Sequence, residues 1–282
     1  MKLIVDNLAG FCMGVRNAVE KVTTELEKQP LIYIHGDIIH NPQTISILKK
    51  KGLISYKDFN EVPAKSCVAI RTHGIPYNEY VSIKNHASSI VNLCCSRVTK
   101  IQSIIKKAGL TNSHVIICGY HDHPEVKSLQ SYASNGVTVI KHPDEIDLVP
   151  LTDKLLLISQ TTFDEELFYK ISDAAKIKFG NRIDIINTIC RATHDRQKNL
   201  ISLLTKNQVT KLIVIGGRQS SNTKRLADIG KSRKIATYHI EELAEFDLNT
   251  VVTDDTIVVT AGASTPDYII NEVINALNEL QK

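Results

Sequence analysis

The sequence lacks the features that mark several common classes of protein. Its 282 residues contain no apolar run near the roughly 20 residues that cross a bilayer, so we expect no membrane segment. No lysine–arginine block and no alternation of basic with aromatic residues occurs, which argues against a nucleic-acid partner. Neither GxGxxG nor GxxxxGKS/T is present, so nucleotide binding has little support.

Signals for export and for disulfides are also missing. The sequence enters a strand-like stretch at Met1–Val5 without a signal or transit segment, and we therefore expect a cytoplasmic protein. In that compartment the six cysteines are better candidates for ligands, catalytic groups or buried thiols than for disulfides. The net charge of +4 fits a soluble protein that attracts anionic small molecules or an acidic protein partner.

Short β-branched runs alternate with amphipathic stretches, which predicts a parallel α/β protein. Helices are predicted where apolar residues recur every three or four positions, beginning at Val15, Val98 and Ile270. The predicted strands are Leu3–Val5, Leu31–Ile34, Val68–Ile70, Ile90–Leu93, Val115–Ile117, Leu155–Ile158, Ile183–Ile186, Leu212–Ile215 and Thr256–Val259.

Three kinds of strand end recur in the same order in each third of the chain. One kind leads to a cysteine (Cys12, Cys95, Cys190), one to a polar cluster, and one to a short polar turn. The repeat predicts three similar α/β lobes, residues 1–95, 96–189 and 190–282, which would share one central site if they face one another around a pseudo-threefold axis. Ligands of open α/β sheets bind beyond the carboxyl ends of the strands, so these ends are expected to share one cavity.

The three repeated cysteines suggest one metal centre. A structural zinc site normally has a fourth protein ligand, whereas a cubane cluster held by three cysteines keeps one iron open for chemistry. Cys67 and Cys118 lie in apolar strands, and core burial is the better interpretation for them. Cys94 adjoins Cys95 and could compete with it, but neighbouring strand residues point to opposite faces.

The polar strand ends suggest an anion site. His40, His73 and His123 follow strands, while Ser220-Ser221-Asn222 opens a helix and Ser264 precedes one; free helix N–H groups and hydroxyls favour phosphate. The simpler alternative is helix capping, which one serine would satisfy. Glu125 is a candidate proton donor, or an acidic residue that merely suits a first helical turn.

These residues carry a resemblance over nearly the whole chain. The matching segments are Gly10–Val15, His40-Asn41, His73-Gly74, His123–Val126, Gln160–Thr162, Thr188–Cys190 with Arg196-Gln197, Ser220–Thr223 and Thr260–Ser264. The chain resembles the 4-hydroxy-3-methylbut-2-enyl diphosphate reductases, the last enzymes of the non-mevalonate isoprenoid pathway.

The resemblance implies a pseudo-threefold trefoil of three α/β lobes around a central iron–sulfur site, with a [4Fe-4S] cluster on Cys12, Cys95 and Cys190. It also implies an allylic diphosphate substrate. It implies that Glu125, Thr161 and His123 serve catalysis. The residues that it implies for diphosphate binding are His40, His73, His123, Ser220, Ser221, Asn222 and Ser264. Because no flavin or nicotinamide motif occurs, electrons would come from an acidic carrier such as ferredoxin or flavodoxin. We expect a monomer.

One departure leaves alternatives open. The family usually has Asp-Ala-Thr-Cys-Pro around its middle cysteine, whereas this chain has Asn92-Leu93-Cys94-Cys95-Ser96. Changed neighbours of a ligand alter its hydrogen bonds and the redox tuning of the metal. The alternatives are a diverged paralogue acting on another diphosphate, a non-catalytic iron–sulfur sensor, or a phosphate-binding module without metal.

Overall fold

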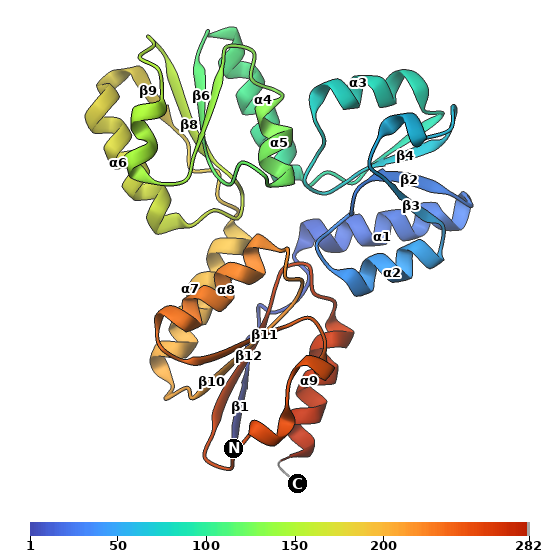
Figure 1. Cartoon of the computed structure of the whole chain (residues 1–282), viewed down its shortest axis with the longest axis vertical. Coiled ribbons are helices and arrows are strands. Elements are labelled where there is room, and N and C mark those ends of the chain that lie inside the picture. Colours follow the sequence, from blue (N-terminus) through green and yellow to red (C-terminus); the bar gives the residue numbers. More distant parts are fainter. Residues whose placement is uncertain (281–282) are drawn as a thin grey trace. The chain divides into compact units, whose positions relative to one another are not determined.

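The computed structural model describes residues 1–280, which form three parallel four-stranded sheets flanked by helices (Figure 1). Within these residues no helix is long and apolar enough to cross a membrane. The chain divides into two compact units. Unit 1 comprises Met1–Arg16, Ile39–Ile47 and Arg191–Lys282, and unit 2 comprises Asn17–Ile38 and Leu48–Cys190. Two helices, α1 (Met13–Lys28) and α2 (Pro42–Lys50), run from one unit into the other.

Unit 1 contains one sheet, with strand order β1-β12-β10-β11. Its strands are β1 (Lys2–Val5), β10 (Lys211–Ile215), β11 (Ala236–Ile240) and β12 (Thr256–Ala261). Alternate residues of β10 face opposite sides: Ile213 packs toward α9 (Asp267–Glu279), while Leu212 packs toward α7 (Arg191–Lys206) and α8 (Ser221–Ser232). The sheet is therefore covered on both faces, as expected for parallel strands.

Unit 2 contains the other two sheets. The first has the order β3-β2-β4-β5 (Leu53–Tyr56, Ile32–His35, Cys67–Ile70, Ser89–Asn92), with α3 (Tyr77–His86) packed on it. The second has the order β7-β6-β8-β9 (Val137–Ile140, His114–Cys118, Leu155–Ser159, Ile183–Ile185). Helices α4 (Ser96–Leu110) and α5 (Pro124–Gln130) cover one face of this second sheet, and α6 (Glu165–Phe179) covers the other.

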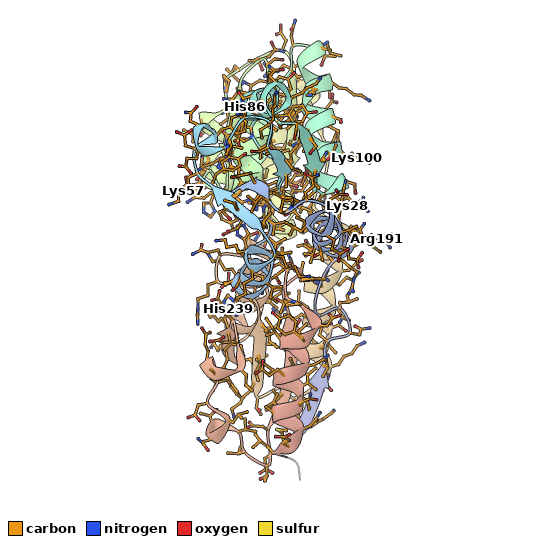
Figure 2. The ribbon with its side chains drawn as sticks, turned by 90° about the vertical axis from the view of Figure 1, so that its right-hand side faces the viewer. Lys28, Lys57, His86, Lys100, Arg191 and His239 are labelled. Carbon is orange, nitrogen blue, oxygen red and sulfur yellow. The ribbon has the colours of Figure 1, made fainter. Side chains whose placement is uncertain are left out.

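Five short 3-10 helices connect these elements in the described part of the chain: Phe59–Glu61, Pro143–Leu148, Gly180–Arg182, Leu243–Glu245 and Leu248–Thr250. Exposed side chains on the outer surfaces include Lys28, Lys57 and Lys100 (Figure 2).

The predicted α/β fold is confirmed, and a strand is present at each of the nine predicted places. The sequence analysis missed β3, β7 and β11, which each lie at the edge of their sheet. Strand β1 pairs with β12, so the first residues complete the sheet of the last third. The lobe boundaries at residues 95 and 189, and the threefold axis, stay predictions.

Candidate active site

The three repeated cysteines occupy equivalent local positions. Each is half-buried and directly precedes a helix: α1, α4 or α7. Each backbone N–H also donates to a carbonyl in the loop that follows a neighbouring strand. The pairs are Cys12 to Ala263 O (3.1 Å), Cys95 to Thr72 O (3.0 Å) and Cys190 to Thr161 O (2.8 Å). The backbone thus fixes each cysteine in the same way, as the sequence repeat predicts.

A second repeated device shapes the turns that lead to the cysteines. At the ends of β1, β5 and β9, a side-chain oxygen accepts a hydrogen bond from the backbone N–H two residues later. The pairs are Asp6 with Leu8 (2.9 Å), Asn92 with Cys94 (2.9 Å) and Asn187 with Ile189 (3.0 Å). This is the Asx turn, which both Asp and Asn form. This chain has Asn92 where the family usually has aspartate, and Asn92 forms the same turn.

The remaining cysteines are packing residues. Cys67 and Cys118 are buried, as predicted, and burial raises the pKa of the Cys118 thiol. Cys94 packs against the cores of both sheets of unit 2, and burial raises its pKa to about 11. Cysteine ligates metal as the thiolate, and burial disfavours that form in Cys94. The choice of Cys95 rather than Cys94 as a ligand stays a prediction.

Glu125 and Thr161 form a buried pair in unit 2. Glu125 lies in the first turn of α5 and is only 2% exposed, and Thr161 follows β8. The backbone N–H of Thr161 donates to Glu125 Oε1 (2.7 Å), and its hydroxyl donates to Oε2 (2.6 Å). Burial raises the pKa of Glu125 to about 7, although both hydrogen bonds from Thr161 oppose the rise. A carboxyl with such a pKa can give up a proton near neutral pH.

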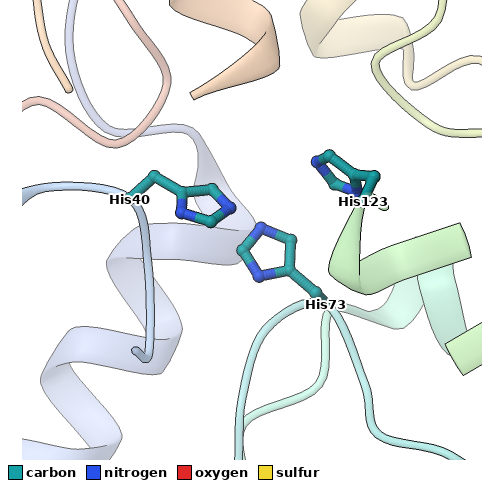
Figure 3. Close-up of side chains that lie close together, drawn as sticks. All are labelled: His40, His73 and His123. Carbon is teal, nitrogen blue, oxygen red and sulfur yellow. The ribbon is translucent and has the colours of Figure 1, made fainter. Parts of the chain in front are cut away.

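His73 and His123 lie together in unit 2, with their rings edge to face and their centroids 5.5 Å apart (Figure 3). His123 is the N-cap of α5, and its Nδ1 accepts a hydrogen bond from Glu125 N (3.1 Å). Because Nδ1 is the acceptor, the neutral ring carries its proton on Nε2. The Nδ1 atom of His123 therefore caps the helix, as the simpler alternative predicts. Its Nε2–H is a hydrogen-bond donor and suits an anion.

In unit 1, the segment at His40 lies against the loops after β10 and β12. Ser264 donates its hydroxyl to the His40 carbonyl (3.3 Å). A Cβ at Gly217 would come within 2.2 Å of the same carbonyl oxygen, so only glycine allows this approach. Asn41 caps α2, its Oδ1 accepting from Thr44 N (2.8 Å). Two candidate diphosphate residues, His40 and Ser264, are thereby held side by side.

The start of α8 holds the clearest sign of a missing polar partner. Ser220 caps the helix, its hydroxyl accepting from Thr223 N (3.3 Å), so the simple interpretation holds for this serine. Asn222 is 3% exposed, yet within the described residues neither polar atom of its side chain has a hydrogen-bond partner. Such buried atoms are normally paired. The donor set of a hydroxyl, an amide and helix N–H groups fits a phosphate.

Sequence reasoning assigned no role to several residues that support this site. Arg196 is buried in α7, and its Nη2 donates to Gly10 O (2.7 Å), two residues before Cys12. Thr188 donates its hydroxyl to Ser159 O (2.5 Å), close to Cys190 in the chain. Their signal in the sequence was their place in the matching segments, but neither bond follows from residue spacing.

Comparison with known proteins decides the family. The family model described as "LytB protein" matches residues 3–278. The chain belongs to the LytB family. A relative from Alkaliphilus oremlandii, named 4-hydroxy-3-methylbut-2-enyl diphosphate reductase, is 36% identical over 283 residues, covering 99% of this chain and 100% of the relative. A relative of the same name from Nitratidesulfovibrio vulgaris is 35% identical with the same coverage.

Solved structures agree with this membership. The E-1-hydroxy-2-methyl-but-2-enyl-4-diphosphate reductase from Plasmodium falciparum matches with a TM-score of 0.91 and 28% identity, over 98% of this chain and 88% of that one. A structure titled (E)-4-hydroxy-3-methyl-but-2-enyl diphosphate reductase, the terminal enzyme of the non-mevalonate pathway, matches with a TM-score of 0.72 and 31% identity, over 99% and 100%. The resemblance to the 4-hydroxy-3-methylbut-2-enyl diphosphate reductases, which the motifs predicted, is therefore confirmed.

Proposed function

We propose that this LytB protein is a 4-hydroxy-3-methylbut-2-enyl diphosphate reductase that forms isopentenyl and dimethylallyl diphosphate. The observation that supports it most directly is the Glu125–Thr161 pair, a buried acid with a pKa of about 7 held by two short hydrogen bonds. The reaction breaks a C–O bond, consumes two electrons and two protons, and releases water. It therefore needs a proton donor that stays partly protonated at neutral pH.

We propose that Cys12, Cys95 and Cys190 hold a [4Fe-4S] cluster. Thiolates are the usual ligands of such clusters. Each of these three half-buried cysteines is held by the same kind of backbone hydrogen bond, whereas Cys67 and Cys118 are core residues. When bound, the cluster would supply the electrons one at a time and Lewis acidity toward the leaving hydroxyl.

The substrate's diphosphate would be bound by His40, His73, His123, Ser220, Ser221, Asn222 and Ser264. Histidine ring N–H groups, hydroxyls and the Asn222 amide are all donors, which suits an anion with many acceptor oxygens. Thr161 would orient the substrate's hydroxyl. Glu125 would give its proton toward the leaving oxygen or the allylic carbon, and the bound diphosphate would hold the reacting carbon within its reach.

Electrons would come from an acidic carrier such as ferredoxin or flavodoxin. Exposed basic residues follow two cysteines closely, Arg16 after Cys12 and Arg97 with Lys100 after Cys95 (Lys100 is labelled in Figure 2). Complementary charge speeds the encounter of such partners. A cytoplasmic location and a monomeric state stay predictions from the sequence.

The deciding experiment is anaerobic reconstitution, followed by iron and sulfide counts and an assay with the hydroxylated diphosphate and a one-electron donor. Four irons per chain with conversion to the two products would support the proposal. A full cluster in Cys95→Ala would refute the assignment of the ligands. A full cluster in the wild type without turnover would favour the alternative of a sensor or a paralogue acting on another diphosphate.

A further inference from the structure

Gln160 joins two loops of unit 2 through both ends of its side-chain amide. It directly follows β8 and is completely buried, with 0% exposure. Its Oε1 accepts a hydrogen bond from the backbone N–H of Tyr120 (3.2 Å), and its Nε2 donates to Thr162 Oγ1 (2.8 Å). The amide is thus committed to one orientation, because exchanging its oxygen and nitrogen would set two donors against each other at Tyr120.

The loop that Gln160 holds on one side leads to the proton donor. Tyr120 lies between β6 and α5, three residues before His123 and five before Glu125. Gly119 lets this loop pass close to Val126 and Gln160, since a Cβ there would lie 2.8 Å from Val126 Cγ2 and 3.3 Å from both Gln160 Cβ and Oε1. The backbone N–H of Gln160 also donates to Cys118 O (2.8 Å) at the end of β6.

On the other side Gln160 holds the segment that carries Thr161. Thr161 meets Glu125 with its N–H and its hydroxyl, and its carbonyl accepts from Cys190 N. Both contacts to Glu125 are short, at 2.7 and 2.6 Å, so they depend on the distance between the two loops. The Gln160 amide spans this distance directly, and its two hydrogen bonds lie beside the pair without using either member of it.

We infer that Gln160 is a positioning residue, which sets the place of the Glu125 carboxyl against Thr161 by tying the loop at Tyr120 to the segment at Thr162. This inference rests on the proposed reductase function and adds a residue to it. Gln160 acts through Glu125 and Thr161. It should therefore affect the proton-transfer step much more than substrate binding, because a misplacement of about 1 Å can cost about 100-fold in rate.

The test uses Gln160→Met, which keeps the length of the side chain and removes both hydrogen bonds. In the cluster-loaded enzyme we expect kcat to fall about 100-fold, with KM within about threefold of wild type and a larger solvent deuterium isotope effect. The matched control is Gln102→Met, which removes another buried amide of unit 2. That amide bonds Ser128 Oγ (3.1 Å), which lies in the same helix as Glu125 but outside the two loops that Gln160 ties together. We expect kcat and KM of the control to stay within about threefold of wild type.

Amide hydrogen exchange supplies a measurement that does not need turnover. Gln160→Met should lower the protection of residues 120–126, and Gln102→Met should not. Thr162→Val removes only one of the two bonds and serves as the milder variant, with an expected loss of about tenfold in kcat. Unchanged exchange in residues 120–126, or an equal loss of kcat in both methionine variants, would overturn the inference. An inactive wild type would instead reject the reductase function, and the exchange result would still decide the role of Gln160.

Discussion

Replacing Glu125 by glutamine separates a proton donor from a carboxyl that merely suits the first turn of a helix. Burial raises the pKa of Glu125 to about 7, so roughly nine-tenths of the side chains are protonated at pH 6 and roughly one-tenth at pH 8. Glutamine resembles the protonated acid in shape. Its Oε1 can accept from Thr161 N, and its Nε2 can donate to the Thr161 hydroxyl, so both contacts survive. The acidic proton is lost.

The expected loss of activity is large and depends on pH. General acid catalysis contributes about 10²–10⁴-fold, so kcat of Glu125→Gln should fall by that factor. The donor acts in its protonated form. Wild-type kcat should therefore be highest below pH 7 and fall about tenfold per pH unit above it, while the variant stays flat. The control is Glu79→Gln, a first-turn carboxylate of α3 that accepts from the Tyr56 hydroxyl (3.2 Å). A normal rate in Glu125→Gln, or an equal loss in Glu79→Gln, would reject the proton role.

The same pKa predicts a pH-dependent change in stability. A carboxyl that titrates at about 4.5 when unfolded and at about 7 when folded costs no stability below pH 4.5. It destabilises the fold increasingly between these values, by roughly 3 kcal/mol above pH 7, because one pH unit corresponds to about 1.4 kcal/mol. Glutamine avoids this cost. The unfolding free energy of Glu125→Gln relative to wild type should therefore rise by roughly 2–3 kcal/mol between pH 5 and pH 8. Urea unfolding followed by circular dichroism would measure it, and an equal difference at both pH values would contradict the calculation.

Three further predictions concern the cluster, the diphosphate and the electron donor. Cys94→Thr should keep the full iron and sulfide content, because its thiol packs in the core; a loss of iron would make it a ligand. Asn222→Ala should raise KM about 10–100-fold with a smaller change in kcat, since a hydrogen bond to a charged group contributes about 1.5–3 kcal/mol; an unchanged KM would exclude this contact. Charge reversal at Arg97 and Lys100 should slow reduction by an acidic carrier about tenfold at low salt but leave a small chemical reductant unaffected. If the wild type and the variant were reduced by the carrier at the same rate at low salt, Arg97 and Lys100 would not belong to the docking site.

The edge strands show where the sequence pattern reaches its limit. The nine strands predicted from apolar runs include the two central strands of every sheet, such as β6 and β8, whose residues are all buried. The three missed strands, β3, β7 and β11, lie at edges and contain polar residues that interrupt the run, for example Ser55 and Thr138. An edge strand has a neighbour on one side only and needs less apolar surface to be stable.

The site was predictable as a set of positions but not as a set of contacts. Parallel strands bring their carboxyl ends to one edge, so Glu125 after β6 and Thr161 after β8 were expected near each other. Both oxygens of the Glu125 carboxylate bind Thr161, and this arrangement depends on the turn at Gln160. The side chain of Gln160 bonds Tyr120, which is 40 residues away in the chain, and Thr162, which is two residues away. Spacing in one sequence does not contain this geometry. The Asx turns at Asp6, Asn92 and Asn187 were more accessible, because an Asp or Asn after a strand is a known turn signal.

The three loops that bind the cysteine N–H groups have the same backbone role but carry different functional side chains. The cysteine N–H groups donate to the backbone carbonyls of Thr72, Thr161 and Ala263. A backbone carbonyl accepts a hydrogen bond whatever the side chain of its residue is. The side chains at these turns are therefore free to differ. In two turns the next residue is a candidate donor to the diphosphate, His73 or Ser264. In the third turn Thr161 instead holds the buried carboxyl of Glu125. A carboxylate beside the proposed diphosphate site would repel the substrate. Burial keeps Glu125 partly protonated at neutral pH, which would reduce that repulsion.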